Sequence, residues 1–170
     1  MTDSNIIPLV VEGRKAYRQP KHVDVLFMVP VASNADLMHD QNIQWIVRNF
    51  RAIIGERTFA LVAFTIGDRA KTGRDLLKNL QARTPEIAAA LRSFRPKIIV
   101  AIGPEMAKTL NQNLASKADR NIVGYIHKMN DAPFTNIIVL PHLVSHNFVA
   151  RNLDEILVTF IKVPFLLDNA

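Results

Sequence analysis

The stretch TPEIAAALRSFRPKIIVAIGPEMAKTL, from Thr84 to Leu110, predicts a helix, a strand and a second helix in immediate succession. Thr84 can cap a helix with its hydroxyl, Pro85 suits a first helical turn, and apolar residues then recur on one helical face. This helix is expected to end at Arg95, because a residue that precedes proline avoids the helical region. The apolar, β-branched run at 98–102 is typical of a strand that is covered on both faces.

The same alternation of strands and helices extends along the chain. Core strands are expected at 23–29, 58–66, 98–102 and 136–140, with a short strand at 121–126, and helices at 41–54, 74–80, 84–94, 104–110 and 152–161. Right-handed crossovers would give an α/β fold, a three-layer α/β/α sandwich around a central, mainly parallel sheet. Residues 1–20 are expected to form an N-terminal arm and residues 21–170 a single domain. Trp45 and Phe50 are expected to be core residues rather than base-stacking groups.

Composition limits the classes of protein to which the chain can belong. With 170 residues, 49% of them hydrophobic, it is long enough for one domain with a sizeable core. The sequence has no cysteine, which excludes disulfides, thiolate catalysis and cysteine-ligated clusters, and no cofactor is expected. No secretory signal and no apolar run long enough to span a bilayer is found, so a cytoplasmic, nucleoid-associated location is expected.

The charge balance favours an acidic partner. The net charge is +6 and the pI is about 9.9, which makes nucleic acid the first candidate partner. Arg69, Lys71 and Arg74 cluster after an expected strand and are candidate phosphate contacts, although a solvated surface is the alternative. The segment is not a P-loop, because the glycine-lysine-serine/threonine order is absent.

Three short motifs follow one another within this order of elements: Thr84-Pro85-Glu86-Ile87, Arg95 to Gly103 (RPKIIVAIG) and Ala107 to Leu110. Together with the order of elements, these motifs resemble the uracil-DNA glycosylase superfamily, and most closely its subfamily that carries an iron–sulfur cluster. The resemblance implies the sandwich fold, DNA binding and hydrolysis of an N-glycosidic bond in base-excision repair. The cluster cysteines of that subfamily are missing here.

The loop after the first core strand departs from the family's pattern. The family places a motif like Gly-Glu-Ala-Pro-Gly there to position water, whereas residues 29–33 read VPVAS. Asn34 and Asp36, with Asp40 beyond them, are the candidates to take over that role if the loop is rearranged. The carboxylates equally suit a helix N-terminus, and Asn34 equally suits a turn. The family's base-reading asparagine at the end of the second strand is also missing, and Thr65 is the polar residue there.

The loop after the last core strand reads PHLVSHN and retains a histidine. His142 matches the family's histidine that stabilises the departing uracil anion, and an ordinary loop histidine is the alternative. The resemblance implies that Ser145, His146, Asn147 and Phe148 meet the DNA. His142 and His146 also have the spacing of a metal pair, but without a third ligand no metal site is predicted.

Three functions remain open from the sequence. The first is a glycosylase-like DNA-binding protein that flips uracil or a related base out of DNA and excises it, with weak or lost activity. The second is a non-catalytic DNA-binding or replication-accessory module with a protein partner in a replication or repair complex, a role that members of the superfamily also serve. The third is a nucleotide-binding α/β domain, which would bind mononucleotides with little salt dependence, whereas DNA binding would weaken steeply with salt. No membrane partner is expected.

Overall fold

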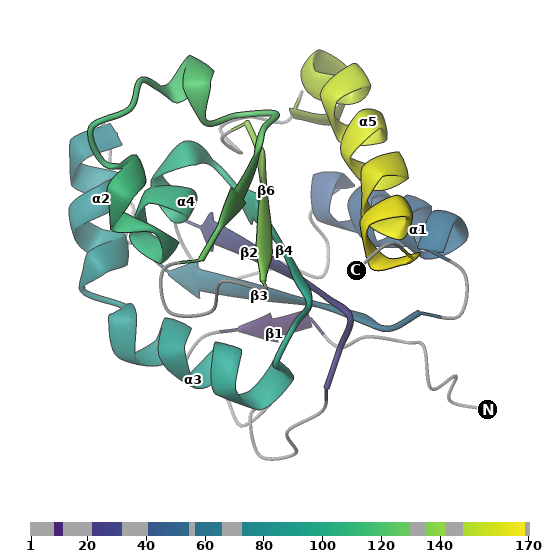
Figure 1. Cartoon of the computed structure of the whole chain (residues 1–170), viewed down its shortest axis with the longest axis horizontal. Coiled ribbons are helices and arrows are strands. Elements are labelled where there is room, and N and C mark those ends of the chain that lie inside the picture. Colours follow the sequence, from purple (N-terminus) through teal and green to yellow (C-terminus); the bar gives the residue numbers. More distant parts are fainter. Residues whose placement is uncertain are drawn as a thin grey trace.

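The structure is a computed structural model, and it describes residues 9–11, 22–31, 41–54, 57–65, 73–129, 135–141 and 148–168 (Figure 1). For residues 9–11, 31, 65, 73 and 148–151 only the backbone is described.

The described strands form one six-stranded sheet in the order β1-β3-β2-β4-β6-β5. The strands are β1 (Leu9–Val11), β2 (Val25–Val31), β3 (Phe59–Thr65), β4 (Ile98–Ile102), β5 (Ile126–Lys128) and β6 (Asn136–Leu140). Every neighbouring pair is parallel except β5 with β6, which is antiparallel. The expected α/β class and mainly parallel sheet are therefore confirmed.

Alternate residues of each central strand pack into two separate apolar cores. On β2, Leu26 and Met28 belong to one core, whereas Phe27 and Val29 belong to the other. The first core includes residues of α2 (Gly73–Gln81), α3 (Thr84–Phe94) and α4 (Pro104–Leu110), and the second includes residues of α1 (Gln41–Ile54) and α5 (Phe148–Asp168). Helices thus cover both faces of the sheet (Figure 1), which explains why the central strands are almost wholly apolar.

A cluster of aromatic rings forms the centre of the second core. The Phe50 ring lies edge-on to Phe27 at 4.8 Å, to Phe160 at 5.0 Å and to Phe59 at 5.1 Å between centroids. Trp45 stacks on Phe160 at 6.2 Å. These rings join α1, α5 and two strands, and edge-on pairs add to the stabilisation that burial already provides. The prediction that Trp45 and Phe50 serve the core is confirmed.

The start of α3 differs from the expectation. Thr84 does not cap the helix, because the helix already includes it and its hydroxyl donates to the carbonyl oxygen of Gln81 at 2.6 Å. Only two residues separate α2 from α3, so this hydroxyl serves the end of the preceding helix. The end of α3 is as expected: Arg95 adopts a left-handed conformation (φ 44°) before Pro96, and its N–H donates to Leu91.

Some strand bounds also differ from those expected: β2 begins at Val25 instead of 23, and β3 covers Phe59–Thr65 instead of 58–66. β2 continues through Pro30 to Val31, whereas a loop was expected from Pro30. The ladder to β4 covers only Val25 to Met28, so Pro30 lies where β2 is paired with β3 alone. The short strand expected at 121–126 is wrong, because Asp119–Asn121 is a 3₁₀ turn and β5 begins only at Ile126.

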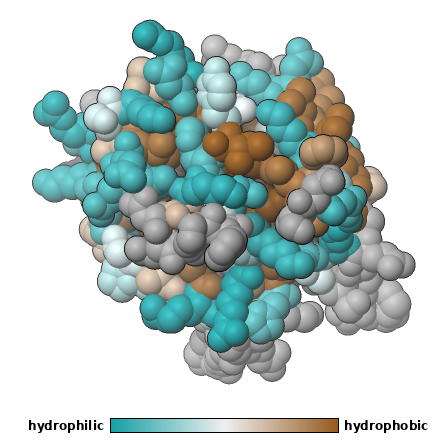
Figure 2. Space-filling model, viewed as in Figure 1, coloured by the Kyte–Doolittle hydropathy of each residue, from teal (hydrophilic) through white to brown (hydrophobic). Residues whose placement is uncertain are grey.

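Helix α5 is longer than the expected 152–161, and its backbone departs from helical geometry near its start. Leu153 is 39% exposed, and non-helical dihedral angles at Asn152 interrupt the helix immediately before it. Leu166 and Leu167 pack against the second core, whereas Phe165 is exposed. Exposed apolar side chains also occur at Val158 and Ile161 on the same helix, and Figure 2 shows hydrophobic surface over α5.

The expected N-terminal arm contributes a strand to the sheet. Leu9–Val11 runs parallel to β3, with Leu9 opposite Leu61 and Val11 opposite Ala63. The rest of the arm lies outside the described residues. Among the described helices, none is long and apolar enough to cross a membrane.

Asp24 connects the amino ends of three strands. Its N–H donates to the Thr58 carbonyl at 3.0 Å, and the Thr58 N–H donates to its carboxylate at 3.3 Å. On the other side, its carbonyl accepts from the Lys97 N–H at 3.0 Å, and its carboxylate pairs with the Lys97 Nζ at 3.7 Å. These interactions therefore join the start of β2 to the residues that immediately precede β3 and β4.

We predict that Asp24→Ala lowers the free energy of unfolding by about 1–2 kcal/mol, because the Thr58 N–H loses its carboxylate acceptor. Asp24→Asn keeps a side-chain oxygen for that N–H and should cost less. Urea unfolding measures both, with Asp154→Ala on the exposed face of α5 as the control. Equal costs for Asp24→Ala and the control would contradict a structural role for Asp24.

Candidate functional site

The carboxyl ends of the long parallel strands meet at one edge of the sheet. In the strand register, Val31 at the end of β2 lies opposite Thr65 at the end of β3, and Ile102 at the end of β4 lies opposite Leu140 at the end of β6. Ligands of open α/β sheets bind outside such ends. A ligand site is therefore expected at this edge.

The chain diverges at this edge between β2 and β4. After β2 it continues to α1, whose residues join the second core, and after β4 it continues to α4, whose residues join the first core. These two helices therefore lie on opposite faces of the sheet, and β2 and β4 are hydrogen-bonded neighbours. A crevice at a topological switch point of this kind is the usual position for a ligand in doubly wound sheets.

The sequence-predicted site residues belong to the segments that connect these strand ends to the next helices. Asn34 and Asp36 lie between β2 and α1, Arg69 and Lys71 lie between β3 and α2, and His142 follows β6. All five lie outside the described residues, as do Ser145, His146 and Asn147. The structure therefore describes the strand ends from which these three segments begin. The roles of the side chains in the segments stay predictions.

Three predicted positions are described in part. Arg74 is exposed in the first turn of α2, where it is accessible to a ligand. Phe148 is the first residue of α5 instead of a loop residue, and only its backbone is described. Thr65 is the last residue of β3, near which the resemblance would have placed an asparagine, and again only its backbone is described.

The turn after β4 is structural. Gly103 has φ 104° and ψ 140°, a region that residues with a side chain rarely adopt, and its N–H donates to the Leu140 carbonyl at 2.9 Å. Pro104 has no N–H to offer, and Glu105 brings a negative charge to the first turn of α4. The conformation of Gly103 and its hydrogen bond to β6 therefore give this turn a structural role.

Glu105, in the first turn of α4, is a residue at this edge that the sequence pattern did not single out. Its side chain is buried, and it is the one buried ionisable residue among those the structure describes. Its Thr109 neighbour donates its hydroxyl to the Glu105 carbonyl at 2.9 Å. The only signal for it in the sequence is an acid within an otherwise apolar helix start, PEMA.

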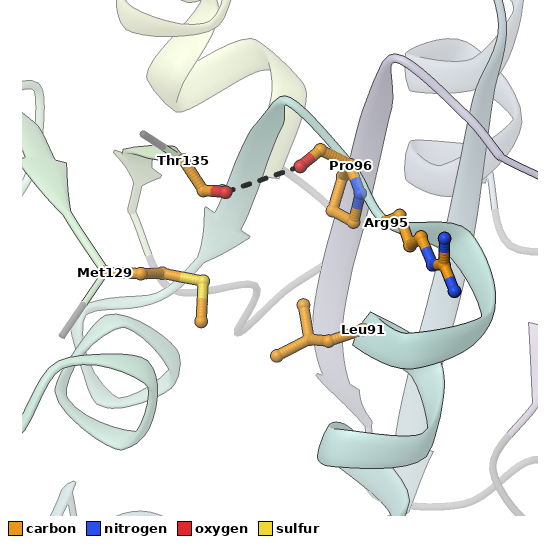
Figure 3. A pocket seen from close by; sticks show the side chains of 5 residues that line it. All are labelled: Leu91, Arg95, Pro96, Met129 and Thr135. Carbon is orange, nitrogen blue, oxygen red and sulfur yellow. Dashed lines mark hydrogen bonds between the residues drawn. The ribbon is translucent and has the colours of Figure 1, made fainter. Parts of the chain in front are cut away.

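A pocket of about 320 Å³ lies at the opposite edge of the sheet (Figure 3). It is lined by Leu91, Arg95, Pro96, Met129 and Thr135, which precede β4 and β6 or follow β5. The Thr135 hydroxyl donates to the Pro96 carbonyl at 3.5 Å, and the Arg95 side chain extends away from Met129. The lining is mainly apolar and includes none of the predicted site residues.

Metal ligation finds no support within the described residues, which contain no group of three histidine or acidic side chains that could hold an ion. The His142 and His146 pair lies outside them.

Neither a protein-family model nor a curated protein matches this sequence.

We predict that Gly103→Ala destabilises the protein by about 2–3 kcal/mol, because alanine strains the backbone at φ 104° and ψ 140°. Gly124→Ala is the matched control: Gly124 also has a positive φ, 85°, but lies closer to the left-handed region that other residues visit, and nothing stands within 4 Å of an added Cβ. Its cost should be about 1 kcal/mol. Chemical denaturation compares the two variants, and an equal or smaller cost at Gly103 would argue against this constraint on the β4 turn.

Proposed function

We propose that this chain is a uracil-DNA glycosylase-like DNA-binding protein that flips uracil or a related base out of DNA and excises it weakly. The observation that supports the proposal best is the convergence of the carboxyl ends of β2, β3, β4 and β6 at one edge. The loops that resemble the family's chemical loops begin at the ends of β2 and β6. In the proposed fold, the helices on the two faces form the outer layers of the family's α/β/α sandwich.

In the proposed reaction, the N-glycosidic bond between C1′ of the sugar and the base breaks, and water forms the new bond to C1′. Asp36, with Asn34 beside it in sequence, orients the water and accepts its proton. The base leaves with the bonding electrons as an anion, which His142 stabilises by donating a hydrogen bond. The base then takes up a proton from solvent. Ser145, His146, Asn147 and Phe148 enter the space left by the flipped base, and Arg69, Lys71 and Arg74 hold phosphates.

A second candidate is a non-catalytic DNA-binding or replication-accessory module on the same fold, with a protein partner in a replication or repair complex. Two sequence observations favour it. The loop after β2 lacks the family's water-positioning motif, and β3 ends in Thr65 where the family has asparagine. Such a module would grip DNA and leave the glycosidic bond intact. A cytoplasmic, nucleoid-associated location belongs to both candidates as a proposal.

We predict that the protein releases uracil from labelled single- or double-stranded oligonucleotides, and that His142→Ala lowers the rate about 100-fold or more, because a preorganised donor to the leaving anion is lost. His22→Ala is the matched control, since His22 is exposed beside the amino edge, next to β2. Alkaline cleavage of the abasic product provides the readout, and a DNA-binding titration at two salt concentrations accompanies it.

The outcomes separate the two candidates. Excision that is lost in His142→Ala and kept in His22→Ala supports the enzyme. Salt-sensitive DNA binding without excision replaces it with the non-catalytic module. If neither excision nor DNA binding is found, both candidates are wrong.

A further inference from the structure

Exposed cations gather on one side of the sheet. On the side of α2, α3 and α4, and on the segment that follows α4, the exposed cations outnumber the exposed acids. The cations are Arg74, Lys78, Arg92, Lys117 and Arg120, and the exposed or half-exposed acids are Asp75, Glu86 and Asp119. On the other side, the exposed acids Asp154, Glu155 and Asp168 of α5 are balanced by the exposed Arg48, by the half-exposed Arg51 and Lys162, and by Arg57, which pairs with Asp168. The described residues therefore present one side with an excess of positive charge and one side that is close to balanced.

Two of the acids on the side with excess positive charge form ion pairs with half-exposed cations that are not among the five exposed cations named above. Lys108 Nζ lies 3.2 Å from the Asp119 carboxylate, and an Arg83 guanidinium nitrogen lies 3.9 Å from the Glu86 carboxylate. Among the described residues, no ion pair involves Lys78, Lys117 or Arg120. The positive charge of these three side chains is thus available to a partner.

The three cations belong to elements that pack together. Leu76 and Leu80 of α2 share the first core with Met106 and Ala107 of α4. Residues on either side of Lys117 and Arg120 are anchored to this core as well, because Leu114 and Ile122 are buried within it.

Hydrogen bonds hold the segment after α4 in place. The buried Asn111 donates to the Lys128 carbonyl at 2.6 Å and accepts from the Asn113 N–H at 3.0 Å, and the pair between Lys108 and Asp119 joins the segment to α4. In Figure 2, hydrophilic side chains project at the margin where Figure 1 places α2. We call the surface of Lys78, Lys117 and Arg120 the α2–α4 basic surface.

This surface adjoins the proposed DNA site along the chain. The loop that carries Arg69 and Lys71 leaves the carboxyl end of β3 and leads into α2, where Arg74 is exposed in the first turn. Lys78 follows Arg74 by four residues, one turn further along the same helix. The candidate phosphate contacts therefore continue from the edge of the sheet onto the side of α2 and α4.

We propose that the α2–α4 basic surface binds phosphates of DNA that extends beyond the base held at the carboxyl edge of the sheet. The proposal rests on the proposed function, because it needs DNA at that edge. A duplex presents a continuous row of phosphates, so a second row of cations adds affinity without reading sequence. These contacts increase the length of DNA that the protein covers. The loops at the carboxyl edge, and not this surface, recognise the base.

The experiment measures binding of a fluorescently labelled duplex across a series of salt concentrations. Its variants are Lys78→Gln, Lys117→Gln and Arg120→Gln, singly and combined. Arg48→Gln is the matched control, because Arg48 is exposed on α1 on the other side of the sheet. Each single variant should reduce the slope of log affinity against log salt by about 1, and the triple variant by about 3, because each phosphate contact releases counterions. Arg48→Gln should leave the slope unchanged.

Each result has a distinct meaning. A reduced slope in the triple variant, with an unchanged slope in Arg48→Gln, supports the proposal. A wild-type slope in the triple variant overturns it and leaves the proposed DNA-binding function intact. If the wild-type protein shows no salt-dependent binding of DNA at all, the proposed function fails and this proposal fails with it.

Discussion

The burial of β2 on all sides is the constraint on which the rest of the structure depends. This strand lies between β3 and β4, and its alternate side chains fill the two cores, with Phe27 in the aromatic cluster and Met28 in the opposite core. A strand in this position needs apolar residues throughout and a helical layer on each face. The chain continues from β2 to a helix of one core and from β4 to a helix of the other, so the same packing makes the carboxyl ends of these neighbouring strands a switch point of the topology.

The two edges of the sheet differ for physical reasons. At the amino edge, Asp24 joins β2 to the residues that precede β3 and β4. Its backbone groups and its carboxylate therefore already have partners within the protein. At the carboxyl edge, the strand ends lead into the polar segments that carry Asn34, Asp36 and His142. The proposed site belongs to these segments. The pocket at Leu91 and Met129 lies away from it.

Residue pattern predicted the elements whose signals are local and strong. The helix Gln41–Ile54 and the strands Ile98–Ile102 and Asn136–Leu140 have the predicted bounds, because amphipathic spacing or a short β-branched run defines each of them. The errors arose where tertiary contacts decide. Thr84 serves a carbonyl of the preceding helix, and the start of β5 depends on pairing with β6. The candidate site was located by its loops alone, and the positions of its side chains depend on loop conformations that no periodicity encodes.

The most direct test of this account is a map of the backbone amides that respond to DNA. Amide chemical shifts would be recorded during titration with a uracil-containing oligonucleotide. The account predicts that the largest changes occur at the carboxyl ends of the strands, at Val31, Ile102, Gly103 and Leu140, with little change at Asp24 or Lys97. Changes centred on the amino edge or on the pocket beside Leu91, with none at the carboxyl ends, would contradict the assignment of the site.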